Sequence, residues 1–516
     1  MAFSKAIGAQ VTGLSGSVVR VEVDRTRGLH SFTIIGLPGK SVEESRERVL
    51  TALKNSGFEN QKSQNQKTIV SLSPSELKKE GTFFDLAIAI GILLSSEELK
   101  IENEDTVFVG ELSLDGTLRP VRGILPITME VKLSGFKRIV VPFENAKEAA
   151  LVENIKVFGA KNVRDVFSAL QSGKIPEYER DDVVIAPEKT VVDFADVRGQ
   201  ESAKRGLVIA AAGGHNALMY GPPGTGKTML AKAFTEILPP LSRKASLEVT
   251  SIHSAAGRLN QDLISNPPIR SPHHSSSYVA MIGGGTFPRP GEVTLAHRGV
   301  LFLDEFPEFG RTVIETLREP LEDRVVTISR SKGIEIFPSH FILIAAMNPC
   351  PCGFLGSEIK QCICAPYDIV RYRKKISGPI LDRIDITLPV EHIPFEKLNE
   401  KIDKKFESGI GGRSVMTSAR IREEILFVRT LQKHRLSHLG IHKETNAELS
   451  VKELAIAAPL SEPVRLLLNS SAEKLALSMR AYHRVIRLAR TIADLDRAEK
   501  INESHILEAL QYRPKF

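Results

Sequence analysis

The sequence predicts an α/β fold that ends in a helical region, and three observations support this class. Strand-like and helix-like apolar patterns alternate over residues 1–172, a second alternating region covers residues 191–396, and residues 397–516 carry mainly helical periodicity. The 516 residues suffice for about three or four units at roughly 150 residues per domain. A single small binding module is therefore excluded.

The first region is predicted to be an α+β domain. Residues 41–58 are expected to form a helix that Ser41 opens, because acidic residues follow in its first turn. Residues 84–96 are an apolar run that predicts a buried helix. Strands are expected over residues 10–25, 30–37, 67–74 and the start of 138–152, the last leading into a helix.

Residues 173–190 are charged, contain proline and show no apolar period, so they are predicted to be a linker. The region after them has apolar strand candidates over residues 216–221, 299–305 and 340–349, separated by helices and long loops. Helices are expected over 418–432, 461–496 and 502–512, which together predict a helical lid.

Charge and hydropathy narrow the class of protein further. Lys and Arg number 69 and Asp and Glu number 62, a formal net charge of +7 that permits an acidic partner without identifying one. The chain has no apolar run of the roughly 18 to 20 residues that a membrane span needs, and its first residues lack the apolar stretch of a secretory signal. We expect a cytoplasmic protein without a membrane partner.

A glycine-rich loop between an apolar strand and a helix carries the strongest chemical signal. In such a loop the backbone N–H groups surround the phosphates of a nucleotide, and the helix N-terminus adds a favourable dipole. Lys227 is expected to reach the β and γ phosphates, and Thr228 to ligate Mg²⁺. The loop consists of Gly221, Pro222, Pro223, Gly224, Thr225, Gly226, Lys227 and Thr228.

Two later strands are predicted to end beside this loop. The strand over residues 299–305 ends in Asp304, which suits the Mg²⁺ shell, and Glu305, which suits polarising an attacking water. The strand over 340–349 delivers Asn348, which could position that water, or could simply cap the turn before Pro349. These residue types in this order predict hydrolysis of a nucleoside triphosphate.

The motifs GPPGTGKT, LFLDE and AAMNP occur here in the order seen in AAA+ ATPases. Longer segments, including IRSPHHSSS, GEVTLAHRGVLFLDE, AAMNPCPCG and ISGPILDRIDI, resemble the magnesium-chelatase-like bacterial ATPases of the ComM/YifB type over essentially the whole chain. The resemblance implies a Lon-protease-like N-terminal domain, a central AAA+ P-loop core and a C-terminal lid. It also implies ATP and Mg²⁺ as ligands and a homo-oligomeric ring, expected to be a hexamer.

The resemblance also assigns arginines to the nucleotide. Arg383 matches the arginine finger that related ring ATPases offer to a neighbouring subunit, although a surface arginine paired with Asp382 or Asp385 is the alternative. Arg480 matches a lid-helix arginine that would contact the nucleotide of its own chain. Arg484 and Arg487 are alternatives about a turn away on the same predicted helix.

Residues 329–341 are predicted to form a hairpin around Gly333. It matches a hairpin that points into the central pore of helicase-like relatives, so the resemblance implies single-stranded or branched DNA as partner and branch migration of recombination intermediates as activity. Arg330 and Lys332 would then contact phosphates. A solvated basic hairpin on the outside of the molecule is the alternative.

All four cysteines lie close together, and four thiolates suit tetrahedral Zn²⁺. The single residue within each pair departs from the commoner spacing of two to four, so buried thiols without metal remain the alternative. The residues are Cys350, Cys352, Cys362 and Cys364. His273 and His274 are not expected to bind metal, because no carboxylate or cysteine stands near them in the sequence.

The N-terminal region resembles the Lon-protease domain without its catalytic pair. Phe83 stands at about the place of the protease serine and Leu125 at that of the lysine, so neither a nucleophile nor its base is expected. Proteolysis is thereby disfavoured. A chelatase-like ATPase that remodels a protein partner remains the main alternative to a DNA motor, and the Asp304–Glu305 pair argues against a scaffold that binds ATP without turnover.

Overall fold

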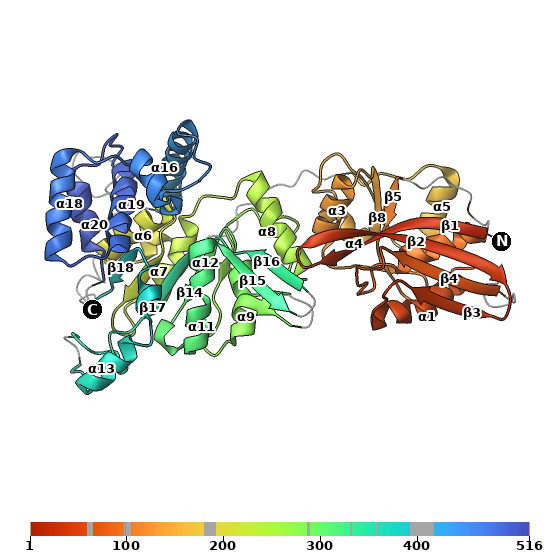
Figure 1. Ribbon diagram of the computed structural model, residues 1–516, viewed down its shortest axis with the longest axis horizontal. Helices are drawn as coiled ribbons and strands as arrows, with labels where there is room; N and C mark the ends of the chain where they lie inside the picture. Colours follow the sequence, from red (N-terminus) through yellow and green to blue (C-terminus); the bar gives the residue numbers. More distant parts are fainter. Residues whose placement is uncertain are drawn as a thin grey trace. The chain divides into compact units, whose positions relative to one another are not determined.

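The computed structural model describes residues 2–58, 66–96, 99, 105–179, 192–285, 289–330, 333–357, 360–392 and 417–514 (Figure 1). The chain divides into two compact units. The first comprises Met1–Ile185 together with Arg243–Ile264, and the second comprises Ala186–Ser242 and Ser265–Phe516. Both units combine helices with a sheet, so the overall α/β class agrees with the prediction.

The first unit is built on a mixed seven-stranded sheet of order β3-β4-β2-β1-β5-β8-β9. β2 pairs antiparallel with β1 and β4, and the other neighbours are parallel. The strands are β1 (Ala2–Thr12), β2 (Ser15–Arg27), β3 (Ser31–Ile35), β4 (Gln66–Ser73), β5 (Thr106–Phe108), β8 (Arg138–Pro142) and β9 (Lys156–Ala160). A separate ribbon pairs β6 (Glu111–Leu112) with β7 (Leu118–Arg119).

Two local predictions for this unit were wrong. The single strand expected over residues 10–25 is a hairpin, because Gly13 has a φ of 58° and reverses the chain between β1 and β2. The helix expected to open at Ser41 begins one residue earlier, as α1 (Lys40–Asn55). Ser41 Oγ instead accepts a hydrogen bond from the Gly81 backbone N–H at 3.0 Å.

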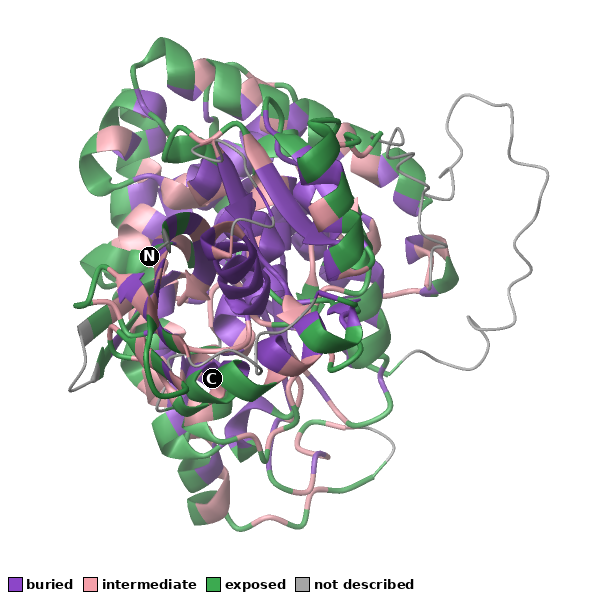
Figure 2. Cartoon of the chain, turned by 90° about the vertical axis from the view of Figure 1, so that its right-hand side faces the viewer, coloured by how far each residue is buried: buried purple, intermediate pink, exposed green. Residues whose placement is uncertain are grey.

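The helices of the first unit cover this sheet. The apolar run over 84–96 forms α2 (Asp85–Ser95), which is buried at ten of its eleven residues, as expected for a helix that is apolar on every face. Buried residues are purple in Figure 2, where they follow the strands and inner helices. The remaining helices are α3 (Ile124–Leu133), α4 (Phe143–Ala149), α5 (Val163–Ser172) and α8 (Arg243–Ala255).

Residues 243–264, which we call the insert, belong to the first unit although they interrupt the sequence of the second. The predicted boundaries, a first region over residues 1–172 and a linker over 173–190, did not include the insert in the first unit. The insert is held by the Arg243 guanidinium, which donates to the Leu151 carbonyl at 3.0 Å, and by an ion pair of Lys147 with Asp262 at 2.7 Å. Leu263 is buried in the same apolar cluster as Leu125.

The second unit is built on a parallel five-stranded sheet of order β11-β14-β17-β10-β18. Every residue of β14 and β17 is buried, which explains their uninterrupted apolar sequences. The strands are β10 (Ala217–Tyr220), β11 (Ile269–Arg270), β14 (Val300–Leu303), β17 (Ile342–Met347) and β18 (Ile386–Pro389).

Short helices and two hairpins complete the sheet region of this unit. The helices are α6 (Glu201–Gly213), α7 (Lys227–Glu236), α9 (Tyr278–Ile282), α10 (Glu292–Leu295), α11 (Arg311–Thr316), α12 (Arg318–Asp323), α13 (Pro366–Arg373) and α14 (Gly378–Leu381). The hairpins are β12 (Gly283–Gly284) with β13 (Arg289–Pro290), and β15 (Val325–Arg330) with β16 (Gly333–Pro338).

The C-terminal helices share one hydrophobic core with the sheet and are not a separate compact unit. Ile344 of the sheet, Ile425 and Leu488 all belong to this core. Figure 1 shows these helices gathered beside α6, in blue. They are α16 (Ser418–His438), α17 (Val451–Ala457), α18 (Glu462–Lys474), α19 (Met479–Leu495) and α20 (Glu503–Gln511).

The long helical stretch expected over 461–496 is two helices. Ala476 takes a φ of 48°, and the Ser478 hydroxyl then caps α19 by accepting from the Ala481 backbone N–H at 3.2 Å.

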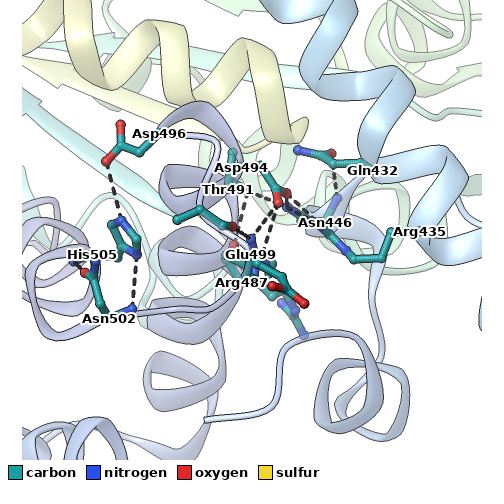
Figure 3. Close-up of polar contacts among 12 residues, drawn as sticks. Gln432, Arg435, Asn446, Arg487, Thr491, Asp494, Asp496, Glu499, Asn502 and His505 are labelled. Atoms are coloured by element: carbon teal, nitrogen blue, oxygen red, sulfur yellow. Dashed lines mark hydrogen bonds and ion pairs between the residues drawn. The ribbon is translucent and has the colours of Figure 1, made fainter. Parts of the chain in front are cut away.

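A buried polar cluster joins these helices (Figure 3). Asp494 accepts hydrogen bonds from Arg435 and Asn446 at 2.9 and 2.8 Å and from Arg490 at 2.8 Å. Asn446 also donates to the Thr491 hydroxyl at 3.0 Å, which lies 2.9 Å from His215 Nε2. Since His215 precedes β10 by two residues, the cluster ties α19 to the start of β10.

Candidate functional site

The glycine-rich loop follows β10 and ends at the N-terminus of α7, as predicted. A Cβ atom on Gly221 would lie 1.9 Å from the Val390 carbonyl oxygen, so only glycine fits where this loop leaves the sheet. Gly226 takes a φ of 90° as the N-cap of α7. The backbone N–H groups at the start of this helix therefore face the space where an anion binds most favourably.

Lys227 lies at the centre of the site. Its side chain is buried, and its ammonium group donates to the carbonyls of Gly221 and Pro222 at 2.8 and 2.7 Å and to Asn348 Oδ1 at 3.3 Å. Burial lowers the pKa of Lys227 from its ordinary value, against the opposing effect of Asp304 and Glu305. The structure thus brings the predicted loop lysine and the predicted strand-end asparagine together.

Thr228 and Asp304 supply two oxygen atoms at one point. The Thr228 hydroxyl donates to Asp304 Oδ2 at 2.8 Å, and the other carboxylate oxygen accepts from the Glu305 backbone N–H at 2.9 Å. A hydroxyl and a carboxylate oxygen are ligands that suit Mg²⁺, which takes few protein ligands and retains waters or phosphate oxygens. The residues present fit the metal that the sequence predicts.

Glu305 has an unusual backbone and an unpredicted partner. Its φ is 49°, a left-handed conformation that is uncommon for a residue with a long side chain. Its carboxylate Oε2 lies 3.2 Å from His274 Nδ1. No carboxylate stands near His274 in the sequence, and the fold brings one to it from 31 positions away.

The four cysteines converge directly after Asn348. The Sγ atoms of Cys350, Cys352 and Cys362 lie 3.4 to 3.7 Å apart, and all four lie within 4.8 Å of one another. Four thiolates about 2.3 Å from one Zn²⁺ would lie about 3.8 Å apart in a tetrahedron. Backbone N–H groups of Phe354 and Ile363 lower the pKa of Cys352 to about 6. The cluster fits a zinc ion.

Arg383 lies at the edge of the sheet opposite the glycine-rich loop. It precedes β18, whose first residue pairs with Ala217 at the start of β10, and its carbonyl accepts from Asn216 Nδ2 at 2.9 Å. The loop begins at the other end of β10, about 13 Å away at 3.3 Å per residue. Arg383 is thus remote from the Lys227 of its own chain.

Two of the arginines meet at one carboxylate. Arg383 forms an ion pair with Glu322, and Arg480 lies 3.5 Å from the same residue. Asp382 and Asp385, the alternative partners considered for Arg383, are instead 3.7 and 3.9 Å from Arg484. Arg480, expected at the nucleotide of its own chain, is therefore placed with Arg383.

The two remaining candidate arginines, Arg484 and Arg487, lie inside α19. Arg484 is buried and donates to the Asp382 carbonyl at 2.8 Å, which is a structural contact. Burial lowers the pKa of Arg487, against the opposing effect of the Asp385 carboxylate.

Family models for the magnesium chelatase subunit ChlI match three parts of the chain: residues 21–145, residues 193–398 and, for its C-terminal part, residues 415–513. Competence protein ComM of Haemophilus influenzae is 40% identical over 508 residues, which cover 97% of this chain and 95% of ComM. Protein YifB of Salmonella typhimurium is 39% identical over 506 residues, with 97% and 95% covered.

The chain belongs to the magnesium-chelatase-like AAA+ ATPases of the ComM/YifB type. Membership in this family agrees with the strand order and the loop geometry of the second unit, and it indicates an ATPase.

The first unit of this ComM/YifB-type chain is similar to Lon proteases. Lon protease 2 of Bacillus subtilis is 27% identical over 174 residues, about 30% of each chain. Phe83 and Leu125, at the expected places of the protease serine and lysine, are both buried in one apolar cluster. Next to Leu125, Glu148 accepts from the Leu125 backbone N–H at 2.8 Å and from the Ser254 hydroxyl of the insert.

The predicted hairpin is present as β15 and β16, paired from Val325–Pro338 to Arg330–Gly333. Its inner face buries Val326, Ile328 and Phe337, whereas Ile334 and Ile336 are 67% and 62% exposed on the outer face. Lys332 and the side chain of Arg330 lie outside the described residues, so their proposed DNA contacts stay predictions.

No helix in the described parts of the chain combines the length and apolar character needed to cross a bilayer.

Proposed function

We propose that this ComM/YifB-type ATPase hydrolyses ATP in a homo-oligomeric ring and uses the cycle to move DNA. The proposal rests on one observation, the convergence of Lys227, Thr228, Asp304 and Asn348 at the loop that ends β10. Parallel strands deliver all of these groups to one edge, which is where nucleotides bind in sheets of this kind.

The residues would divide the work of hydrolysis. Lys227 exchanges its three oxygen acceptors for phosphate oxygens, and the α7 N-terminus supplies N–H donors. Mg²⁺, held by Thr228 and Asp304, would neutralise charge on the β and γ phosphates. Glu305 accepts a proton from the attacking water, and Asn348 orients that water.

Arg383 supports a ring rather than a monomer. The Arg383 backbone lies about 13 Å from the glycine-rich loop of its own chain, at the other end of β10. We therefore propose that its guanidinium contacts the γ-phosphate bound by a neighbouring chain. Arg480 shares Glu322 with Arg383, and we propose that both arginines leave this carboxylate for the neighbour's nucleotide. The family resemblance supplies the hexamer as the expected number of subunits.

The DNA step is proposed from the hairpin and from the relatives. By family resemblance, the substrate is a branched recombination intermediate, and the relative named competence protein ComM supports a role in the uptake and integration of foreign DNA. Arg330 and Lys332, at the hairpin end, are the proposed phosphate contacts.

A protein partner is the second candidate. The exposed pair Ile334 and Ile336 favours it, because apolar side chains on a hairpin face add to protein contacts and contribute little to phosphate binding. In that case the same ATPase cycle would remodel a protein.

We also propose that Zn²⁺ binds Cys350, Cys352, Cys362 and Cys364 as a structural ion. It would fix the loop that leaves Asn348, and so the position of that amide beside Lys227.

Branch migration on a synthetic three-strand junction tests the function. The parent should resolve the junction with ATP, Glu305→Gln should bind ATP without resolving it, and Lys227→Ala should lose ATP binding. ATPase stimulation by branched DNA should fade as salt rises. An ATPase rate that DNA leaves unchanged would favour the protein partner, and equal turnover by Glu305→Gln would remove the proposed role of Glu305.

A further inference from the structure

The loop after β11 reaches the catalytic edge of the sheet for a topological reason. β11 pairs parallel with β14, through Ile269–Val300 and Arg270–Leu301. The segment that follows Arg270 therefore leaves the sheet at the same edge as Asp304 and Glu305, which follow β14. His274 lies four residues beyond the end of β11, within reach of these acids.

Contacts on both sides hold this loop in place. His273 Nδ1 lies 2.8 Å from the Ser275 hydroxyl, and the His273 carbonyl accepts from the Ser276 backbone N–H at 2.9 Å. The Ser277 hydroxyl then caps α9 by accepting from the Ala280 N–H at 3.2 Å. The His274 ring also packs against His273, with ring centroids 4.1 Å apart. These contacts hold the His274 imidazole in place.

Glu305 requires such a support. Its side chain is 54% exposed, and an exposed glutamate side chain samples many rotamers. The left-handed backbone fixes only the direction in which the side chain leaves the chain. His274 Nδ1, 3.2 Å from Oε2, restrains the far end of the side chain and leaves Oε1 able to accept a proton. A half-exposed polar contact of this kind adds little to folding stability, so its contribution is geometric.

We propose that His274 is the positioning residue for Glu305: it orients the carboxylate toward the attacking water and does not itself contact ATP. This proposal rests on the proposed function, in which Glu305 is the base. A base displaced by about 1 Å can lose a large part of its rate, whereas nucleotide binding depends on Lys227 and the glycine-rich loop.

The test compares ATPase kinetics of full-length variants. His274→Ala should lower kcat at least about tenfold while KM and ATP affinity stay unchanged. His274→Asn, which retains an N–H donor near the place of Nδ1, should restore most of the rate. His434→Ala is the matched control, because His434 is an exposed histidine of α16 that contacts His438 and not Glu305, and it should change kcat less than about twofold.

A double variant isolates the pathway. In a Glu305→Gln background, His274→Ala should cause no further loss, because the two residues act as one unit. A kcat for His274→Ala that equals or exceeds that of the parent would overturn the proposal, as would an equal loss in His434→Ala. If the parent itself fails to hydrolyse ATP, the proposed function fails instead, so the two failures are distinct.

Discussion

Asp494 shows how a single buried charge organises the helical part of the second unit. Its carboxylate is fully enclosed and accepts from two arginines and from Asn446, so every approach to it is a charged or amide donor. A buried carboxylate is tolerated only with such complete satisfaction. Removing it would leave the buried Arg490 and the partly exposed Arg435 without their main acceptor.

Asp494→Ala is therefore expected to lower the free energy of unfolding of the second unit by about 3 to 5 kcal/mol. Asp496→Ala is the control, since Asp496 is 45% exposed where it pairs with Arg205, and it should cost about 1 kcal/mol or less. Denaturant titration of both variants measures the difference. Equal losses would mean that enclosure of Asp494 does not set its importance.

His340 carries a prediction about pH. Burial, followed by the positive charges of Arg324 and Arg298, lowers its pKa from 6.5 to about 2. The unfolded chain binds a proton on this residue below about pH 6.5 and the folded chain does not, so stability is full above pH 6.5 and falls toward pH 2. Between pH 6.5 and 5.5 the loss is about 1 kcal/mol.

His340→Asn should remove this part of the pH dependence. The Tm of the parent is expected to fall more steeply from pH 7 to pH 5.5 than that of the variant, as measured by thermal unfolding in matched buffers. Parallel curves would contradict the assignment. Other histidines, such as His505, titrate equally in both proteins and cancel in the comparison.

At the scale of elements, strand order assembles the site. β14, β17 and β10 lie side by side and run parallel, so the residues that follow them meet at one edge, although Lys227 and Asn348 lie 121 positions apart. The cysteine loop continues from the last of these strands. Because its four thiols lie close enough to bind one zinc ion, the metal content of the protein tests the proposed zinc site directly.

Protein purified without added zinc should contain about one Zn²⁺ per chain by elemental analysis. Cys352→Ser should bring this well below half an equivalent, because Cys352 lies 3.4 and 3.6 Å from two of the other thiols. Lys227→Ala, which leaves the cluster intact, is the control and should retain the metal. If the parent contains no zinc, the zinc proposal is wrong and packing alone holds the cysteine loop.

The sequence predicted those parts of the site that local patterns encode. The glycine-rich loop, the acid pair after β14 and Asn348 each follow an apolar strand, so strand-then-loop chemistry was enough to find them. The pairing of His274 with Glu305 could not be predicted, because it depends on β11 lying next to β14. The turn at Gly13 and the break at Ala476 were missed because the surrounding apolar pattern continues through both.

At the scale of the whole molecule, the two compact units are not two consecutive stretches of sequence. The insert completes the core of the first unit through Leu263, in the same cluster as Phe83 and Leu125. Its sequence gave no sign of this, since residues 243–264 have ordinary composition and stand between two strands of the ATPase sheet.

Leu263→Asp in the full chain should loosen the first unit, because it places a charge in an apolar cluster. Hydrogen exchange of residues 121–152 is expected to speed up at least about tenfold, while exchange in α7 stays unchanged. Gln261→Asp, at an exposed position of the insert, is the control and should leave both unchanged. Unaltered exchange in Leu263→Asp would mean that the insert only rests against the unit.

The place of the insert in the sequence limits how the two units can be expressed separately or exchanged between homologues. A gene cut at residues 173–190 would yield an N-terminal fragment that lacks the insert, and a C-terminal fragment in which α8 has lost the unit that it packs against. Homologues could therefore trade this unit only by moving two separated stretches of gene together. Each new protein chain likewise finishes its first unit only after the P-loop has been synthesised.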